Sequence, residues 1–463
     1  MRKISGPLIL VLFAAVFLNG CGGGGGGGVP SPTPKKIIYS SQTGGMRDLH
    51  LIEQDGTGLV TLASSTFDEW FAGIAGRRIL FYRQVGPVDT QLHSVLPDGS
   101  GSTLLTTNVY GSKVMPDATV LVSRMIGNVS NLYRVIADGT GLTQVTSGAY
   151  VESVDGFTSD NRVVLSRYPA GGGQQDLYVM NPDGTGITSL ATTSYSESFE
   201  AMTSDNRVIF SRDMGGGQSD LFVVNSNGTS LLSLATTTFP ETFESLVSNA
   251  GAVYLFTLGA QSDLYLVTFG TGTPITTALA TTTNQEFFVK MTSDSRVIFS
   301  SRTAPGAPYD VKIVNADGTG LASLASTTDD EQFAGLTSDN RVVFTRTVGA
   351  QNDISIVNAD GTGLVPLAAT TNNESFAAIA PDNRIIFTGT EGSQTNLYSI
   401  NANGTGLTAL TTGAGMKWFI TLSPEGRVLF AKDTYNIYSV KLDGTDLTPV
   451  ATSTGTEIFN AFF

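Results

Sequence analysis

Eight glutamates recur at one position of a repeated pattern, and their spacing makes them the first candidates for chemistry. Six lie eight residues before a turn aspartate or its equivalent, and two more share the local pattern Glu-x-Phe. The eight are Glu69, Glu152, Glu197, Glu241, Glu286, Glu331, Glu374 and Glu457. Hard cations such as calcium prefer carboxylate oxygens. If the segments that carry these residues line one channel, a site for a cation or a basic ligand is one interpretation.

Ion pairs inside each repeat are the second interpretation, and we favour it. A two-residue turn at Asp205-Asn206 predicts that Phe199 faces Arg212 across a hairpin, with Glu197 diagonal to that arginine. Arginines at the matching place are Arg83, Arg167, Arg212, Arg302 and Arg346, as partners of Glu69, Glu152, Glu197, Glu286 and Glu331. No arginine matches Glu241, Glu374 or Glu457, so any ligand site is expected near these three.

Two tryptophans supply a further candidate surface. Trp70 and Trp418 stand in the middle of the Glu-x-Phe pattern, where the side chain points to the other face of a strand. They could stack on a sugar or an aromatic ligand. With two histidines and one cysteine in the chain, no zinc cluster, Cys-His nucleophile or disulfide framework can be assembled, and we predict no cofactor, metal or catalytic residue.

A turn of the type Asp-Gly-Thr-Gly sets the frame that positions these residues. It recurs every 40 to 45 residues once one gap of 90 is halved, at Asp55, Asp98, Asp138, Asp183, Asn227, Asp317, Asp360, Asn403 and Asp443, with a degenerate copy at 270–272. The unit at 197–237 contains four β-patterned segments: 197–203, 207–212, 220–225 and 231–237. Four short antiparallel strands with this period are typical of a β-propeller blade.

The repeats also resemble a known family. TSDNRVIFSR and DLYVMNPDGTGITSLATT, at 203–212 and 176–193, look like the WD-like repeats of TolB-type propellers. We therefore expect an all-β protein, a single large β-propeller of about ten four-stranded antiparallel blades over residues 35–463. The segment 457–463 is expected to complete the first blade and close the ring, which removes exposed strand edges. Two smaller propellers are the alternative.

The first residues are expected to be a signal peptide followed by a tether. Residues 1–20 have a basic start and an apolar run at 8–18, as in a signal peptide. Leu18-Asn19-Gly20-Cys21 resembles the lipobox of bacterial lipoproteins, which implies that Cys21 is lipidated and inserted in a membrane. Residues 21–34 continue as a Gly-rich and then Pro-rich spacer. Gly22 after the cysteine favours the outer membrane in the enterobacterial sorting pattern, with a periplasmic or surface face.

Charge and repetition complete the functional expectation. The formal net charge is −14 with no basic run, which argues against a nucleic-acid partner. Because the acidic residues repeat like scaffold, we expect a non-catalytic, monomeric, lipid-anchored scaffold of the cell envelope that binds a protein or polymer partner. A small-ligand or cation-binding propeller that uses the central channel is the alternative, and a carboxylate-dependent carbohydrate-active enzyme is a third class.

Overall fold

Every regular element among the described residues is a β-strand. The computed structural model describes residues 35–463 except 271, 369 and 433–434, and these belong to one compact unit, Pro34–Phe463. The predicted signal segment 1–20, Cys21 and the tether 21–34 lie outside the described residues. No helix long and apolar enough to cross a lipid bilayer occurs in the part of the chain that is described.

The strands of the described residues form six four-stranded sheets and two eight-stranded sheets. The first sheet has the order β3-β2-β1-β40, with β1 (Ile37–Thr43), β2 (Met46–Ile52), β3 (Val60–Ala63) and β40 (Thr456–Phe462). The other four-stranded sheets are β4 (Asp68–Ala75), β5 (Arg78–Gln84), β6 (Thr90–Val95) and β7 (Thr103–Thr106); β16 (Ser196–Met202), β17 (Arg207–Gly215), β18 (Gln218–Asn225) and β19 (Leu232–Ala235); β28 (Asp330–Leu336), β29 (Val342–Val348), β30 (Gln351–Val357) and β31 (Val365–Ala368); β32 (Asn373–Ile379), β33 (Ile385–Glu391), β34 (Gln394–Ile400) and β35 (Thr408–Ala409); and β36 (Lys417–Leu422), β37 (Val428–Lys432), β38 (Asn436–Val440) and β39 (Thr448–Ala451).

Each eight-stranded sheet consists of two four-stranded groups joined by one parallel residue pair. The first contains β8 (Val109–Val114), β9 (Thr119–Ile126), β10 (Val129–Ile136) and β11 (Thr143–Gln144), then β12 (Tyr150–Phe157), β13 (Val163–Pro169), β14 (Asp176–Met180) and β15 (Thr188–Ala191), joined by Ser130 and Val151. The second contains β20 (Glu241–Ser248), β21 (Gly251–Leu258), β22 (Gln261–Thr268) and β23 (Ile275–Ala280), then β24 (Gln285–Met291), β25 (Arg296–Arg302), β26 (Asp310–Asn315) and β27 (Ala322–Ala325), joined by Ser262 and Gln285. The same four-stranded unit therefore underlies all of these sheets.

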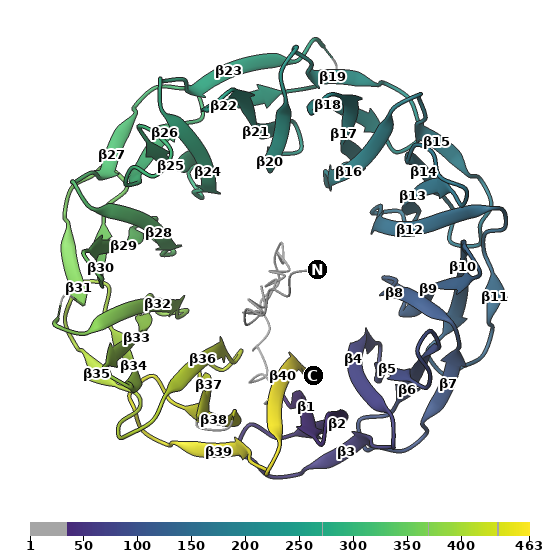
Figure 1. The fold of residues 1–463 in the computed structure, drawn as a ribbon, viewed down its shortest axis with the longest axis horizontal. Coiled ribbons are helices and arrows are strands. Elements are labelled where there is room, and N and C mark those ends of the chain that lie inside the picture. The colour runs from purple at the N-terminus through teal and green to yellow at the C-terminus, as the bar shows by residue number, and fades with distance from the viewer. Residues whose placement is uncertain (1–34, 271, 369, 433–434) are drawn as a thin grey trace, which may run out of the picture. The chain divides into compact units, whose positions relative to one another are not determined.

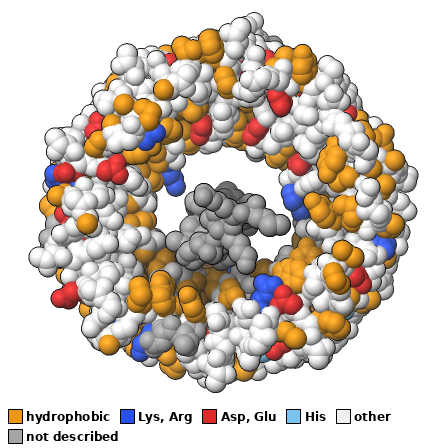
Figure 2. Space-filling model, in the orientation of Figure 1, with side chains coloured by type: hydrophobic (Ala, Val, Ile, Leu, Met, Phe, Trp, Pro, Cys, Tyr) orange, Lys and Arg blue, Asp and Glu red, His pale blue; other side chains and the backbone are white. Residues whose placement is uncertain are grey.

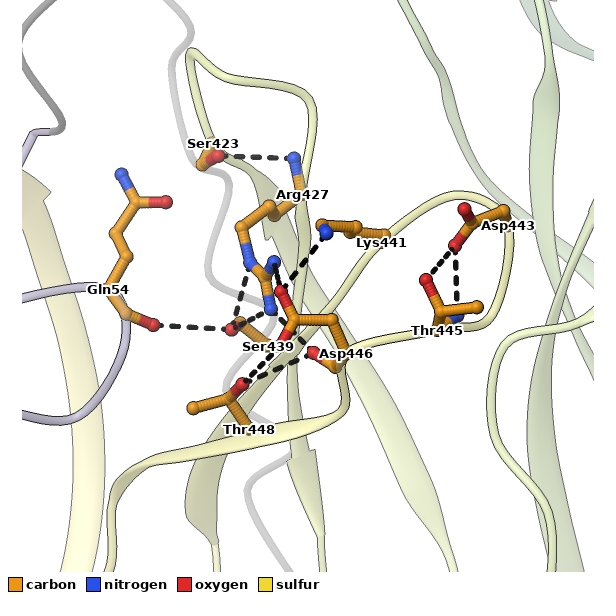
Figure 3. Close-up of polar contacts among 9 residues, drawn as sticks. All are labelled: Gln54, Ser423, Arg427, Ser439, Lys441, Asp443, Thr445, Asp446 and Thr448. Carbon is orange, nitrogen blue, oxygen red and sulfur yellow. Dashed lines mark hydrogen bonds and ion pairs between the residues drawn. The ribbon is translucent and has the colours of Figure 1, made fainter.

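The units follow one another in chain order around the centre of the view in Figure 1. The first strand of each unit lies toward the inside and the last outside, except that β40 takes the inner place in the sheet of β1, β2 and β3. Strands from both ends of the chain share one sheet, because β40 pairs with β1 in antiparallel register. Its neighbour, the sheet of β36–β39, contacts it through Ser439, whose hydroxyl donates to the Gln54 carbonyl oxygen at 3.3 Å (Figure 3). Arg427 beside them pairs with Asp446 at 2.7 Å.

The hydrophobic core lies between neighbouring sheets. One cluster combines Val164, Leu177 and Val179 of β13 and β14 with Val208 and Phe210 of β17, all fully buried. Since the second strand of a unit is covered on both faces, it reads as a continuous apolar run and not as an alternating one. This explains why Val208, Ile209 and Phe210 are adjacent in sequence and all buried.

The first hairpin of each unit differs in register from the sequence-based prediction. Glu197 lies directly opposite Arg212 and Phe199 opposite Phe210, with a bulge between Phe199 and Ala201. The turn is longer than predicted, since the Thr203 amide donates to the Arg207 carbonyl oxygen and Asn206 takes a positive φ of 65°. Asparagine tolerates this left-handed conformation better than most residues. The longer turn and the bulge together move the glutamate opposite the arginine.

The Asp-Gly turns connect each unit to the one before it. Gly184 has a φ of +85°, and a Cβ atom there would lie 2.0 Å from the Val145 carbonyl oxygen of the preceding unit. Several other turn glycines approach the preceding outer strand in the same way, among them Gly56, Gly228, Gly318 and Gly444. The recurring glycine therefore serves both the turn geometry and the close contact between units.

Candidate functional site

The eight recurring glutamates are buried at 0–4% exposure, so they do not form an open acidic ring. Figure 2 shows acidic and basic side chains scattered over the visible face, some of them side by side, with no continuous acidic ring around the opening. Each glutamate accepts a hydrogen bond from a serine or threonine hydroxyl a few residues earlier, as Glu374 does from Thr370 and Glu457 from Ser453. The first strand of the unit holds the carboxyl and the preceding loop supplies the hydroxyl.

Three of the five predicted arginine pairs are confirmed. Nε of Arg83, Arg167 and Arg212 donates to Oε1 of Glu69, Glu152 and Glu197 at 2.9, 2.8 and 3.2 Å. The two predicted pairs at Glu286 and Glu331 are wrong.

Glu286 lies opposite Ser301, because the register places Arg302 opposite Gln285, to which it donates at 2.7 Å. Arg346 lies opposite Glu331 but donates to Asp329 at 2.9 Å. That side chain is 42% exposed, so its guanidinium has turned toward the surface carboxylate.

A second acid of the preceding unit lies near most of these glutamates, which the sequence analysis missed. Burial raises the pKa of Glu241, and the nearby Asp220 carboxylate raises it further. Burial likewise raises the pKa of Glu374 and that of Glu286. The carboxylates of Asp353 and Asp263, respectively, raise these two pKa values further. An aspartate followed by an aliphatic residue near the start of the third segment is the signal that would have located this partner, as in Asp220-Leu221, Asp263-Leu264 and Asp353-Ile354. The junctions between units therefore contain pairs of carboxyl groups that favour a proton or a cation.

One carboxyl oxygen in most of these glutamates has no hydrogen-bond partner although it is buried. The atoms are Oε2 of Glu69, Glu197, Glu241, Glu286, Glu374 and Glu457. An unsatisfied buried polar atom costs about 1–3 kcal/mol, more when it is charged. Each such oxygen is thus a place where a proton, a cation or a ligand donor would be stabilising.

Glu374 lines a larger cavity than Glu152 does, since the two volumes are about 470 and 230 Å³. The cavity has a volume of about 470 Å³ and is lined by Glu374, Thr370, Asn372, Phe387, Gly389, Tyr398, Pro366, Leu367, Ala368 and Leu407. Glu374 is 1% exposed, whereas Leu407 is 57% exposed. Glu374 therefore belongs to the buried part of the lining, whereas the rim of the cavity reaches the surface.

Gly389 creates this space. It lies opposite Glu374 in the hairpin of β32 and β33, where Arg212 lies opposite Glu197. Among the residues opposite the eight glutamates it is the one without a side chain, since the others are Arg83, Arg167, Arg212, Phe256, Ser301, Arg346 and Ser41. The signal was present in the sequence as a glycine in the place of an arginine.

The other two glutamates nominated from the sequence have different surroundings. Phe256 lies opposite Glu241, and its ring packs edge-on against Tyr265 with centroids 6.2 Å apart. Ser41 lies opposite Glu457 and donates to its Oε1 at 3.2 Å. Neither residue lines the cavity of Glu374, so the structure does not bring the three glutamates together.

Both tryptophans stack within the protein. Trp70 lies 5.5 Å from the ring of Tyr82, with the Arg47 guanidinium carbon 5.5 Å from its ring centroid. Trp418 stacks on Tyr435 at 5.2 Å and is 36% exposed. Neither lines the cavity of Glu374, and their role as ligand-stacking residues stays a prediction.

The turn aspartates use their oxygens within the turn. The Asp443 Oδ1 atom accepts from the amide and the hydroxyl of Thr445 at 2.9 and 2.6 Å (Figure 3). These bonds lower the pKa of Asp443, and the hydroxyl bond has the larger effect. No group of three or more His, Cys, Asp or Glu side chains suited to a metal ion occurs among the described residues.

Comparison with known proteins gives a likeness of fold. No family model matches the chain, and no curated protein matches it. The crystal structure of TolB from Acinetobacter baumannii is similar at 14% identity, with 54% of this chain and 65% of that chain covered and a TM-score of 0.30. Dipeptidyl peptidase 4 from Porphyromonas gingivalis is similar at 11% identity, with 77% and 64% covered and a TM-score of 0.46, and the tricorn protease at 16%, with 84% and 40% covered and a TM-score of 0.27.

The chain spans less than two thirds of the length of each of these structures. The all-β class and the four-stranded antiparallel units expected from the sequence are confirmed by the described sheets themselves, and TolB is among the structures to which the chain is similar.

The expectation of a non-catalytic scaffold is contradicted by the same comparison. Similar structures carry the names of peptidases and a hydrolase, including dipeptidyl peptidase 4, puromycin hydrolase and the tricorn protease. We inferred the absence of catalysis from the repetition of the acidic residues. That inference was wrong because the repetition reflects only the scaffold, and a propeller scaffold occurs in proteins with catalytic activity. The absence of catalysis is therefore no longer part of our interpretation.

Proposed function

We propose that this chain is a β-propeller that binds a small cationic ligand in the cavity at Glu374. The observation that carries the proposal is Glu374, a buried residue that lines a cavity of about 470 Å³ and whose Oε2 atom has no hydrogen-bond partner. A buried carboxylate without a counter-charge is costly. An ammonium or guanidinium group in the cavity would supply both the missing hydrogen bond and the opposite charge.

The rest of the cavity fits such a ligand. Asp353 of the preceding unit adds negative potential near Glu374. Tyr398 and Phe387 stack with centroids 5.4 Å apart and line the same cavity, so ring faces are available for a cation. Leu367 and Leu407 offer apolar surface to an aliphatic part of the ligand. Charge, aromatic surface and apolar surface together describe an alkyl chain that ends in a cation.

The scaffold that holds this cavity is, in our proposal, one closed propeller of ten blades. Six four-stranded sheets and two that each divide into two four-stranded groups support the count. The antiparallel pairing of β40 with β1 and the core of Ile37, Tyr39, Leu429 and Ile437 between the first and last sheets support closure.

Anchoring at a membrane is the remaining part of the proposal. The lipobox-like segment before Cys21 and the spacer after it suit a bacterial lipoprotein of the cell envelope. More than one acyl chain is needed for stable anchoring. We expect membrane association of the full chain to be lost in the Cys21→Ala variant, measured by fractionation of intact cells. Membrane retention of that variant would contradict lipidation at Cys21.

Ligand binding is tested by calorimetric titration of the full-length chain with butylammonium, butylguanidinium and neutral butylurea. We expect saturable binding of at least one cation and none of the urea. Absence of binding by both cations would overturn the proposed function.

Two glutamine variants provide the matched control. Glu374→Gln removes the charge at the cavity and is expected to weaken cation binding at least about tenfold, the usual cost of a lost hydrogen bond to a charged group. Glu241→Gln changes the same position of another unit, where Phe256 occupies the opposite place. It is expected to leave binding unchanged. Equal loss in both variants would point to an effect of net charge and not to the cavity.

A further inference from the structure

We propose that the cationic group recognised at Glu374 is a guanidinium, supplied by an arginine side chain of the ligand. This inference rests on the proposed function and names its ligand class. It comes from a comparison of the chain with itself. Four units have an arginine where the unit of β32–β35 has only Gly389, and in three of them the arginine donates to the glutamate.

The unit of β16–β19 shows what the missing arginine does. The Arg212 guanidinium carbon lies 4.3 Å from the ring centroid of Phe222, while its Nε donates to Glu197 at 3.2 Å. The carboxyl is 0% and the arginine side chain 14% exposed. The guanidinium is thus held between a buried carboxyl and an aromatic ring.

The same arrangement recurs elsewhere in the chain. Arg167 donates to Glu152 at 2.8 Å, and its guanidinium carbon lies 4.9 Å from the ring of Tyr178. Arg83 donates to Glu69 at 2.9 Å. The fold therefore accepts a guanidinium at this position repeatedly.

The unit of β32–β35 has the glutamate and the aromatic ring of this arrangement but lacks the guanidinium. Glu374 corresponds to Glu197, and Tyr398, which lies opposite Phe387, corresponds to Phe222. Glu374, Phe387, Gly389 and Tyr398 all line the cavity. A Cβ atom at Gly389 would lie 3.1 Å from the Tyr398 ring, so that ring stands directly over the vacant position.

A guanidinium fits this frame better than an ammonium. Its planar group can stack on the Tyr398 ring and donate along its edge to Glu374 at the same time, whereas an ammonium is a compact, strongly hydrated charge. The mouth of the cavity at Leu407 and Pro366 is exposed, which leaves room for the aliphatic stem and the main chain of an arginine. The ligand thus supplies from outside what Arg212 supplies from within the chain.

The test compares capped amino acids as ligands of the full-length chain by calorimetry. N-acetyl-argininamide is the probe, N-acetyl-lysinamide carries an ammonium, and N-acetyl-citrullinamide is a neutral analogue of similar shape. We expect the arginine probe to bind at least tenfold more tightly than the lysine probe, with no binding of the citrulline probe. Equal or tighter binding of the lysine probe would overturn this inference and leave the proposed function in place. Failure of both cationic probes would overturn the proposed function itself.

Two substitutions exchange the arginine and the glycine between the two units. Gly389→Arg places a guanidinium in the cavity from within the chain, and we expect it to abolish binding of the arginine probe and to raise the thermal stability. Arg212→Gly opens the corresponding position beside Glu197, and we expect it to raise the stoichiometry from one bound probe to two. Undiminished binding to folded Gly389→Arg would overturn the inference, and this result is decisive even where Arg212→Gly fails to fold.

Discussion

Glu374 and Gly389 show how a single substitution in a repeated scaffold creates a distinct site. The glutamate is common to eight units, so it cannot specify a site on its own. The residue opposite it decides what surrounds the carboxyl: a guanidinium at Glu197, an aromatic ring at Glu241, a hydroxyl at Glu457 and open space at Glu374. The chemistry of each unit therefore depends on one position of its second strand.

The turn glycines allow a prediction at the same scale. Gly184→Ala should destabilise the protein, because φ is +85° and the new Cβ would meet the Val145 carbonyl oxygen at 2.0 Å. Gly216→Ala is the matched control, with a φ of +66° and nothing within 4 Å of the new Cβ. We expect the control to cost about 1–2 kcal/mol, the penalty for the left-handed conformation, and Gly184→Ala to cost clearly more.

Chemical denaturation of the two variants measures the difference. An equal loss of unfolding free energy in both would contradict the close contact between units at Gly184.

The acid pairs between units act at the scale of the sheet. Glu241 belongs to the first strand of one unit and Asp220 to the third strand of the unit before it. Burial raises the pKa of Glu241 in the folded protein, and the negative charge of Asp220 raises it further. A proton on this glutamate removes its charge, and with it both the cost of burying that charge and its repulsion by Asp220. We expect the junction to be tightest when Glu241 is protonated.

A pH dependence of stability follows from this shift. Because the pKa of Glu241 is raised on folding, its stabilising contribution is complete below the unfolded-state pKa of glutamate and is lost as the pH rises through the folded-state value. Glu241→Gln keeps a donor at this position and does not titrate. We expect this variant to have a higher Tm than the natural chain at neutral pH, with the difference disappearing on acidification toward about pH 4.

Glu152→Gln is the control for that experiment. Glu152 is paired with Arg167 at 2.6 Å, so its amide variant should destabilise the protein at neutral pH, by about 1–3 kcal/mol. A Tm of Glu241→Gln that stays below that of the natural chain at every pH would refute the protonated pair.

For the whole molecule, the last strand is the element that joins the two ends of the described chain in one sheet, and the proposed closure depends on it. β40 pairs with β1, and the Phe463 amide donates to the Lys36 carbonyl oxygen at 2.9 Å. Ala461 and Phe463 also pack against a core that includes Ile38 and Phe81. Without this strand, β1 would present an unpaired edge and two sheets would lose part of their core.

Deletion of 457–463 should therefore lower the thermal stability strongly, measured by calorimetry on the full-length chain with and without the deletion. Glu457→Gln keeps the strand and serves as the control, for which we expect a small change. An unchanged melting temperature after the deletion would contradict the proposed closure of the ring.

The sequence by itself determined the repeated unit, its four strands and the turns between them. Periodicity, β-branched residues and the Asp-Gly turns are local signals, because each reports on the conformation of a few neighbouring residues. The three ion pairs of Glu69, Glu152 and Glu197 were also within reach, since both partners belong to one hairpin.

The tertiary structure decided what lies between units. The approach of Asp353 to Glu374, the close contact of Gly184 with Val145 and the cavity over Tyr398 each join segments of different strands or different units. The register of the hairpin was also not predicted from the sequence, because a bulge at one residue shifts every facing pair beyond it. Such features depend on packing across the junctions, and no local signal in a repeated sequence specifies how one repeat fits against the next.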